Sequence, residues 1–173
     1  MRLGWLGLAG MLALSGCASL SEDECLSADW RTIGFTDGAQ GRTVGHVDRH
    51  REACAGVGVA PDLDAWLAGR QQGLRQYCTP QNAYRLGRSG RALSPVCSNP
   101  DTLRPAHARG QRFYRIGQDI REAESELFEM RRDLQALPDE ADRVRASLRR
   151  QIVRQQAWIA RLRAERQRHA RWP

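Results

Sequence analysis

A regular spacing of apolar side chains over the last third of the chain most strongly constrains its fold. Between Phe113 and Leu137 these side chains recur at alternating intervals of three and four residues, which is the heptad pattern of a helix packed along a second helix. Pro138-Asp139-Glu140 interrupts the pattern, and a looser seam follows at Ala141, Val144, Leu148, Ile152, Gln155, Ile159 and Leu162. We therefore expect residues 105–173 to form a long antiparallel helical hairpin, similar to a coiled coil. The alternative is one kinked helix whose seam pairs with another subunit in a homo-oligomer.

The N-terminus has the pattern of an export signal followed by a lipid attachment site. Residues 1–16 contain a basic start and an apolar run that is too short to span a bilayer. Leu14-Ser15-Gly16-Cys17 resembles the bacterial lipobox at every position. We expect Cys17 to carry the lipid that anchors the chain to a bilayer, and residues 17–24 to form a lipidated linker. Ala18 replaces the aspartate that retains such lipoproteins at the inner membrane, which favours the outer membrane, facing the periplasm.

Four cysteines remain in the region 25–104, which we expect to be a small helical domain. They are Cys25, Cys54, Cys78 and Cys97. In an exported chain an even number of cysteines indicates disulfides, here two bridges with three connectivities. A zinc site is the alternative, but no two of these cysteines have the close spacing of a zinc knuckle. If residues 27–40 and 45–55 form an antiparallel helix pair, the bridges are Cys25–Cys54 and Cys78–Cys97.

Glycines in this region follow aromatic residues by about one helical turn. The pairs are Trp30–Gly34, Trp66–Gly69, Tyr84–Gly87 and, further along, Tyr114–Gly117. Glycine within a helix is unfavourable by roughly 1 kcal/mol relative to alanine, so its recurrence needs a reason. Close packing of two helices is the preferred reason, because the strand that precedes a phosphate-binding glycine loop is missing from the pattern.

Several of these motifs together resemble a known family. They are Cys25-x-x-Ala28-Asp29-Trp30, Gly34-x-x-Asp37-Gly38-x-x-Gly41, His50-x-x-x-Cys54, Gly69-x-x-x-Gly73-Leu74-x-x-Tyr77-Cys78-Thr79-Pro80 and Gly87-Arg88-x-Gly90. This combination is similar to that of the small bacterial lipoproteins of domain-of-unknown-function family 2799. The resemblance covers roughly residues 20–120 and implies an exported helical domain with paired cysteines. It implies no activity.

Polar side chains near the first helices are the candidates for chemistry. His46 and His50 are separated by one helical turn and share a face, as metal ligands do. No acid completes a metal-binding signature, so we prefer a surface or capping role and expect neither a metal nor a cofactor. Asp29, Trp30, Asp37 and His50 are a candidate ligand or partner site, although Asp29 also suits a helix N-cap. No set of nucleophile, base and oxyanion donor can be assembled, so we expect no enzyme.

The charge of the chain is concentrated in its last helix. All 27 basic residues are arginine, and residues 143–171 contain ten of them against Glu165 alone. This helix also carries Trp158 and Trp172, which suit a membrane interface. Binding to an anionic envelope polymer or to an envelope protein is one interpretation, and ion pairing with the acidic side chains of the first hairpin helix is the other. An exported chain does not meet nucleic acid.

These observations favour an all-α envelope lipoprotein, in which a glycine-rich, disulfide-linked domain precedes a helical hairpin. We expect a structural or adaptor role for it, with the lipid holding one end and the hairpin presenting a surface to a partner. The alternative is a small-ligand-binding or enzymatic domain that uses Asp29, Asp37 and His50.

Overall fold

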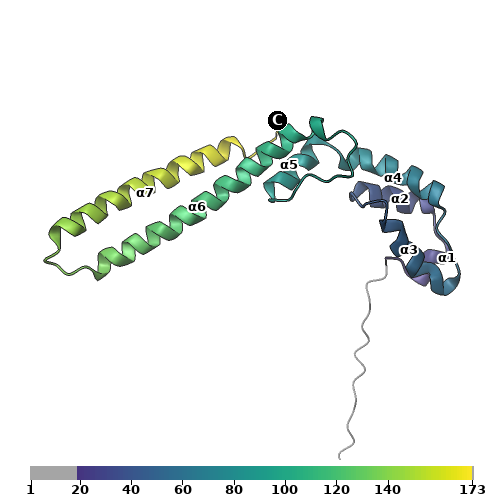
Figure 1. Cartoon of the computed structure of the whole chain (residues 1–173), viewed down its shortest axis with the longest axis horizontal. Coiled ribbons are helices and arrows are strands. Elements are labelled where there is room, and N and C mark those ends of the chain that lie inside the picture. The colour runs from purple at the N-terminus through teal and green to yellow at the C-terminus, as the bar shows by residue number, and fades with distance from the viewer. Residues whose placement is uncertain (1–18, 173) are drawn as a thin grey trace, which may run out of the picture.

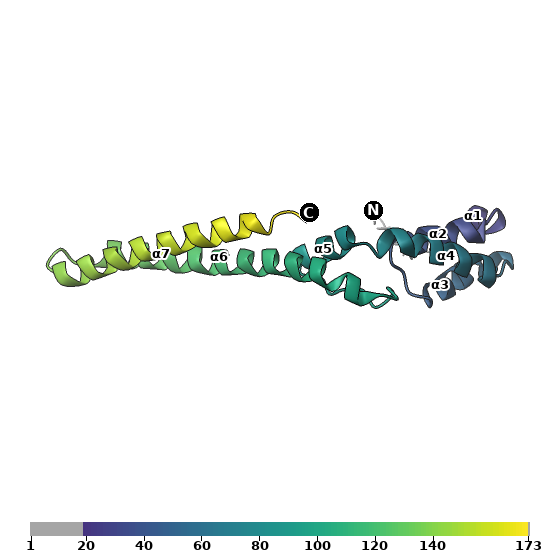
Figure 2. The same ribbon diagram turned by 90° about the horizontal axis from the view of Figure 1, so that it is seen from above.

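The structure is a computed structural model that describes residues 19–172, and every regular element within this range is helical, as the sequence predicts. The molecule is elongated, with the disulfide-linked domain at one end and a helical hairpin extending from it (Figures 1 and 2). The expected signal segment and Cys17 lie outside the described residues. Between residues 19 and 172, no helix is both long enough and apolar enough to cross a membrane.

Short helices build the disulfide-linked domain. They are α1 (Glu22–Leu26), α2 (Trp30–Ala39), α3 (His46–Cys54), the 3₁₀ turn η1 (Ala55–Val57), α4 (Leu63–Tyr77), α5 (Pro80–Arg88) and the 3₁₀ turn η2 (Pro100–Thr102). Side-chain oxygens of Ser21, Asp29, Asp62 and Thr79 accept hydrogen bonds from backbone N–H groups of the first turns of α1, α2, α4 and α5. These caps fix where each helix begins. Thr79 is the N-cap of α5, and Pro80 is its first residue.

Helices α2 and α4 run in the same direction and cross in backbone contact through glycines on both sides. A Cβ added at Gly34 would lie 2.0 Å from the carbonyl oxygen of Trp66, and one at Gly69 would lie 1.9 Å from that of Arg31. Gly38 and Gly73 are equally close to the facing backbone. A side chain at any of these positions would force the helices apart, which confirms packing as the reason for the glycines.

Helix α5 and the start of α6 (Arg104–Ala136) repeat this arrangement. In both pairs the first helix is followed by a glycine with positive φ, Gly41 at 71° and Gly90 at 75°. A tyrosine of the second helix, Tyr77 or Tyr114, covers that glycine, so that an added Cβ would lie within 3 Å of its ring. The left-handed conformation and the covering ring together require glycine at both positions.

Equivalent hydrogen bonds within each helix pair show which residues of the two pairs correspond. The carbonyl oxygen of Arg42 accepts from the guanidinium of Arg70, and that of Arg91 accepts from the ring of His107. The N–H of Arg42 donates to the carbonyl of Asp37, and the N–H of Arg91 donates to that of Leu86. The two helix pairs are therefore structural repeats, in which Leu86 occupies the position of Asp37.

Two disulfides connect these helices with the predicted pairing. Cys25 and Cys54 are bridged with a Cα–Cα distance of 5.5 Å, and Cys78 and Cys97 with one of 5.6 Å. The expected antiparallel pair of residues 27–40 and 45–55 is wrong, because the glycine face of α2 packs on α4. The first bridge instead joins α1 to the end of α3.

The hairpin consists of α6 and α7 (Asp142–Arg168), which lie side by side in both views (Figures 1 and 2). The buried seam comprises Ile116, Ile120, Ala123, Leu127, Ile159 and Leu162. Gln155 satisfies its amide within the seam by donating to the Ala123 carbonyl at 3.2 Å and to Glu126 at 2.7 Å. Val144 was expected in the seam but is 55% exposed. The seam of α6 is thus occupied by α7 of the same chain.

The C-terminal segment fastens the hairpin to the disulfide-linked domain. The Tyr84 hydroxyl donates to the carbonyl of His169 at 2.6 Å, and Arg88 donates to that of Ala170 at 3.0 Å. Trp172 packs against Tyr84, with 6.5 Å between ring centroids. The ring of Trp172 is therefore partly buried in this internal contact.

Candidate functional site

A buried carboxylate, that of Asp37, lies at the centre of the first helix pair. Its side chain extends from α2 to contact residues of α3 and α4, and Asp37 is only 6% exposed. Its Oδ2 accepts hydrogen bonds from the indole N–H of Trp66 at 2.9 Å and from Nε2 of His50 at 2.8 Å. A buried carboxylate needs such donors, because removing a charge from water without them is strongly unfavourable.

Helix α3 supplies two imidazoles from one face to this carboxylate. His46 and His50 are one turn apart, with ring centroids separated by 5.1 Å, and Nε2 of His46 is 3.5 Å from Oδ1 of Asp37. Burial lowers the pKa of His46 below its ordinary 6.5, while the Asp37 carboxylate opposes this shift and His50 adds to it. His46 is therefore mainly neutral at pH 7, with a nitrogen lone pair free to accept a proton or a cation.

Ser19 completes the cluster from the start of the described chain. Its hydroxyl is 2.9 Å from Nδ1 of His50, so His50 bridges the carboxylate of Asp37 and the hydroxyl of Ser19. With the proton on Nε2, the imidazole donates to the carboxylate and accepts from the hydroxyl. This contact fastens the segment that precedes α1 to α3.

An open cleft of about 1030 Å³ adjoins the cluster. Its lining includes Ser19, Thr32, Asp37, Arg42, His46 and Arg49. Side chains of both charges line it, because Glu24 and Glu52 also contribute. The cleft gives a small polar ligand or an ion access to the imidazoles.

The structure brings some of the predicted site residues together and separates others. Asp37 and His50 are in hydrogen-bond contact, and the ring of the buried Trp30 lies 6.3 Å from that of His50. Asp29 is not part of the site, because its exposed carboxylate caps α2 by accepting from the N–H groups of Arg31 and Thr32. The Thr32 hydroxyl is the main cause that lowers the pKa of Asp29.

The histidines also differ from the surface or capping role expected for them. His50 is 3% exposed and His46 is partly buried, because α3 turns this face towards the domain. The acid between them, Asp48, is exposed and pairs with Arg51. The sequence indicated that the two imidazoles share a face and grouped His50 with Asp37, but it did not indicate that His46 would also face this carboxylate.

The sequence does not predict two members of the cluster, Trp66 and Ser19. Trp66 was read only as part of the glycine pattern, although its indole donates to Asp37 across 29 residues. Ser19 belongs to the segment that the sequence predicts to be a lipidated linker. Neither carries a local signal, since each reaches the site through tertiary packing alone.

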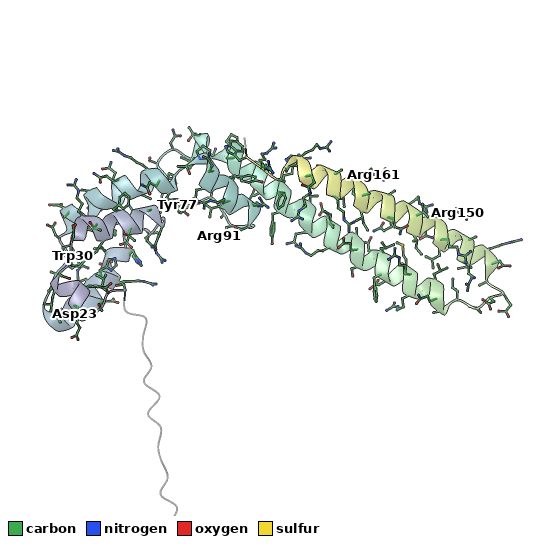
Figure 3. All side chains as sticks on the ribbon, turned by 180° about the vertical axis from the view of Figure 1, so that it is seen from behind. Asp23, Trp30, Tyr77, Arg91, Arg150 and Arg161 are labelled. Carbon is green, nitrogen blue, oxygen red and sulfur yellow. A yellow bond between two sulfur atoms is a disulfide. The ribbon has the colours of Figure 1, made fainter. Side chains whose placement is uncertain are left out.

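A separate surface, the arginine face of α7, consists of Arg143, Arg150, Arg154, Arg161 and Arg168. Their spacing of seven, four, seven and seven residues places them within about 40° of one another around the helix. All five are exposed, and Figure 3 labels Arg150 and Arg161 on this helix. Between residues 19 and 172 none of the five forms an ion pair with a carboxylate.

The acidic residues of α6 were expected to pair with these arginines, but the contacts are fewer. Arg163 of α7 forms an ion pair with Glu124 of α6 at 2.6 Å. A second ion pair has its charges reversed, with Arg112 on α6 and Glu165 on α7 at 3.2 Å. Arg163 flanks the seam, and Glu165 lies between the seam and the arginine face, one turn from Arg161 and Arg168, with its carboxylate paired to Arg112. The pairing therefore supports the hairpin without neutralising that face.

Taken together, the fold and the site define a class: an all-α, disulfide-linked domain with a buried Asp–His cluster and a coiled-coil hairpin. Residues 29–112 match the model of the family described as "Protein of unknown function (DUF2799)". This part of the chain belongs to that family, and the resemblance noted in the sequence is confirmed. It contains both helix pairs and the residues Asp37, His46, His50 and Trp66, while most of the hairpin lies beyond it. No curated protein and no solved structure matches the chain.

Proposed function

We propose that this protein is an envelope lipoprotein that acts as an adaptor, with lipid on Cys17 at one end and an anionic surface bound by the hairpin at the other. The anionic surface is that of a phosphate-bearing envelope polymer or lipid. The main observation that supports this proposal is the arginine face of α7.

Support for the tether comes from the N-terminal pattern and from the position of Ser19. Ser19 lies two residues after Cys17 and contacts α3, at the end of the molecule away from the hairpin (Figure 1). A lipid on Cys17 would therefore enter the bilayer beside the disulfide-linked domain. Several acyl chains on one residue suffice for stable anchoring. Such a lipoprotein sorted to the outer membrane would face the periplasm.

Support for the binding surface comes from charge that the chain itself leaves uncompensated. The five guanidinium groups extend over about 37 Å of α7. The exposed Trp158, whose ring lies 5.5 Å from the guanidinium of Arg161, borders the same stripe. Each arginine near an anionic lipid surface contributes roughly 1 kcal/mol of attraction, which salt weakens.

Vesicle binding tests this proposal on the exported chain with Cys17→Ser, so that lipid does not mask the hairpin. Vesicles of phosphatidylcholine are compared with vesicles that also contain phosphatidylglycerol, and lipopolysaccharide serves as the polymer. The test variant changes Arg150, Arg154, Arg161 and Arg168 to glutamine. The matched control changes Arg115, Arg121, Arg131 and Arg132, which are equally charged, exposed and scattered around α6.

We expect binding to the anionic vesicles or lipopolysaccharide only, and a loss of at least about tenfold in the α7 variant, given about 1 kcal/mol for each arginine. The α6 control should lose much less. Equal losses would mean that net charge alone acts, and an unmodified chain that binds neither anionic probe would refute the proposal.

A further inference from the structure

Three side-chain atoms of the Asp37 cluster are arranged as ligands of one ion. One atom each of Asp37, His46 and His50 lies within 4.8 Å of the other two. Nε2 of His46 lies 3.5 Å from Oδ1 of Asp37, and Nε2 of His50 lies 2.8 Å from Oδ2, the other oxygen of the same carboxylate. Ligands at about 2.0–2.1 Å from a tetrahedral ion stand roughly 3.4 Å apart, so small rotations of the imidazoles would admit the ion.

The groups behind these atoms would orient them for ligation. Histidines that bind a metal through one ring nitrogen use the other in a hydrogen bond, and the acids that bind with them are also hydrogen-bonded. Nδ1 of His50 already has the hydroxyl of Ser19 at 2.9 Å. Oδ2 of Asp37 has the indole N–H of Trp66 at 2.9 Å, so Oδ1 remains for the ion.

The second helix pair packs in the same way without this carboxylate. Leu86 occupies the position of Asp37 in the second pair and is equally buried, at 6% exposure. Arg70 and His107 occupy equivalent positions, and the residue four positions before each is Trp66 in the first pair and the buried Leu103 in the second. Since apolar residues serve the same packing there, and a buried charge disfavours folding, the polar cluster of the first pair calls for another explanation.

We infer that Asp37, His46 and His50 bind a divalent transition-metal ion, for which Zn²⁺ is the best match. Two imidazoles and one carboxylate suit Zn²⁺, Co²⁺, Ni²⁺ or Cu²⁺, whereas Mg²⁺ and Ca²⁺ prefer oxygen ligands alone. Three protein ligands leave the fourth position open towards the cleft. A water molecule or a small anion in the cleft, which Arg42 and Arg49 also line, would complete the coordination.

Isothermal titration of the untagged, disulfide-bonded chain with ZnCl₂ tests this inference, with MgCl₂ as the negative probe. His46→Gln removes the most accessible ligand, and Asp37→Asn removes the carboxylate. Asp48→Asn is the matched control, because it removes the same charge from the same His-x-Asp-x-His segment outside the cluster. The melting temperature of each chain in EDTA reports whether the substitution itself disturbs the fold.

The expected result is one Zn²⁺ per chain, at least tenfold weaker binding in His46→Gln and Asp37→Asn, unchanged binding in Asp48→Asn, and no binding of Mg²⁺. A wild-type chain that does not bind Zn²⁺, or variants that bind it as before, would overturn the inference. The absorption spectrum of the Co²⁺-loaded wild-type chain is a test that needs no variant. Tetrahedral bands without thiolate charge transfer support the cluster, and a thiolate band would place the ion on cysteines instead.

Discussion

Substitution of Gly34 by alanine should destabilise the protein far more than one methyl group normally does. Alanine favours a helix over glycine by about 1 kcal/mol, so propensity alone predicts stabilisation. The new Cβ would lie 2.0 Å from the carbonyl oxygen and 2.9 Å from the Cα of Trp66. Because these are backbone atoms of α4, no side-chain rotation relieves the overlap, and the two helices must separate by more than about 1 Å to reach ordinary contact.

The magnitude follows from what this separation removes. Overpacking of this kind is unfavourable by about 1–3 kcal/mol. The hydrogen bond from Trp66 to Asp37, now 2.9 Å long, would break, and a bond to a charged group contributes about 1.5–3 kcal/mol. After the gain in helix propensity, the net loss of unfolding free energy is about 3 kcal/mol. For a chain of this size the melting temperature should fall by about 6–12 °C.

Urea and thermal unfolding followed by circular dichroism would measure this loss, with Gly56→Ala as the control. A Cβ at Gly56 has nothing within 4 Å, and its φ is not positive. The control should therefore change the unfolding free energy by less than about 0.5 kcal/mol. If Gly34→Ala is as stable as the wild type, the close packing of α2 on α4 is wrong.

Three further predictions concern the rest of the chain. Removing the second bridge by Cys78→Ala and Cys97→Ala, which are 19 residues apart, should lower the unfolding free energy by about 3 kcal/mol in urea titrations; an unchanged midpoint would contradict the bridge. Burial, helped by Arg109, lowers the pKa of His169 below 6.5, so the unfolded chain binds more protons and stability should fall as pH drops below about 6.5. His169→Gln should remove this part of the pH dependence, and parallel curves for both chains would refute it. Cys17→Ser should abolish the lipid mass increment of the mature protein, and an unaltered mass difference would place the lipid elsewhere.

The periodic and paired features of the sequence predicted the parts of the fold that depend on local interactions. The heptad seam places Ile116, Ile120 and Leu127 on one side of α6 in any arrangement, because their spacing follows the helical repeat. The proline turn then brings α7 back over them. The cysteine pairing was also predicted, although the helix arrangement that suggested it is wrong for α2 and α3.

The candidate site could be predicted only in part. His46 and His50 lie one turn apart on a single helix, so their shared face is a property of the sequence. Asp37 was grouped with His50, which it contacts, and with Asp29, which instead satisfies the first turn of α2. Which carboxylate of α2 joins the histidines depends on the orientation of α2, and the packing of α2 against α4 determines that orientation.

The sequence by itself therefore determined the helical class, the heptad seam of α6 and the spacing of the arginine face, since each depends on residues that are close in the chain or on a regular repeat. Only the tertiary structure decided the structural repeat of the helix pairs and the meeting of Asp37, His46, His50, Trp66 and Ser19. The physical reason is that glycines permit close approach without specifying a partner. The backbone contact of α2 with α4 selects that partner and so places the carboxylate beside the imidazoles.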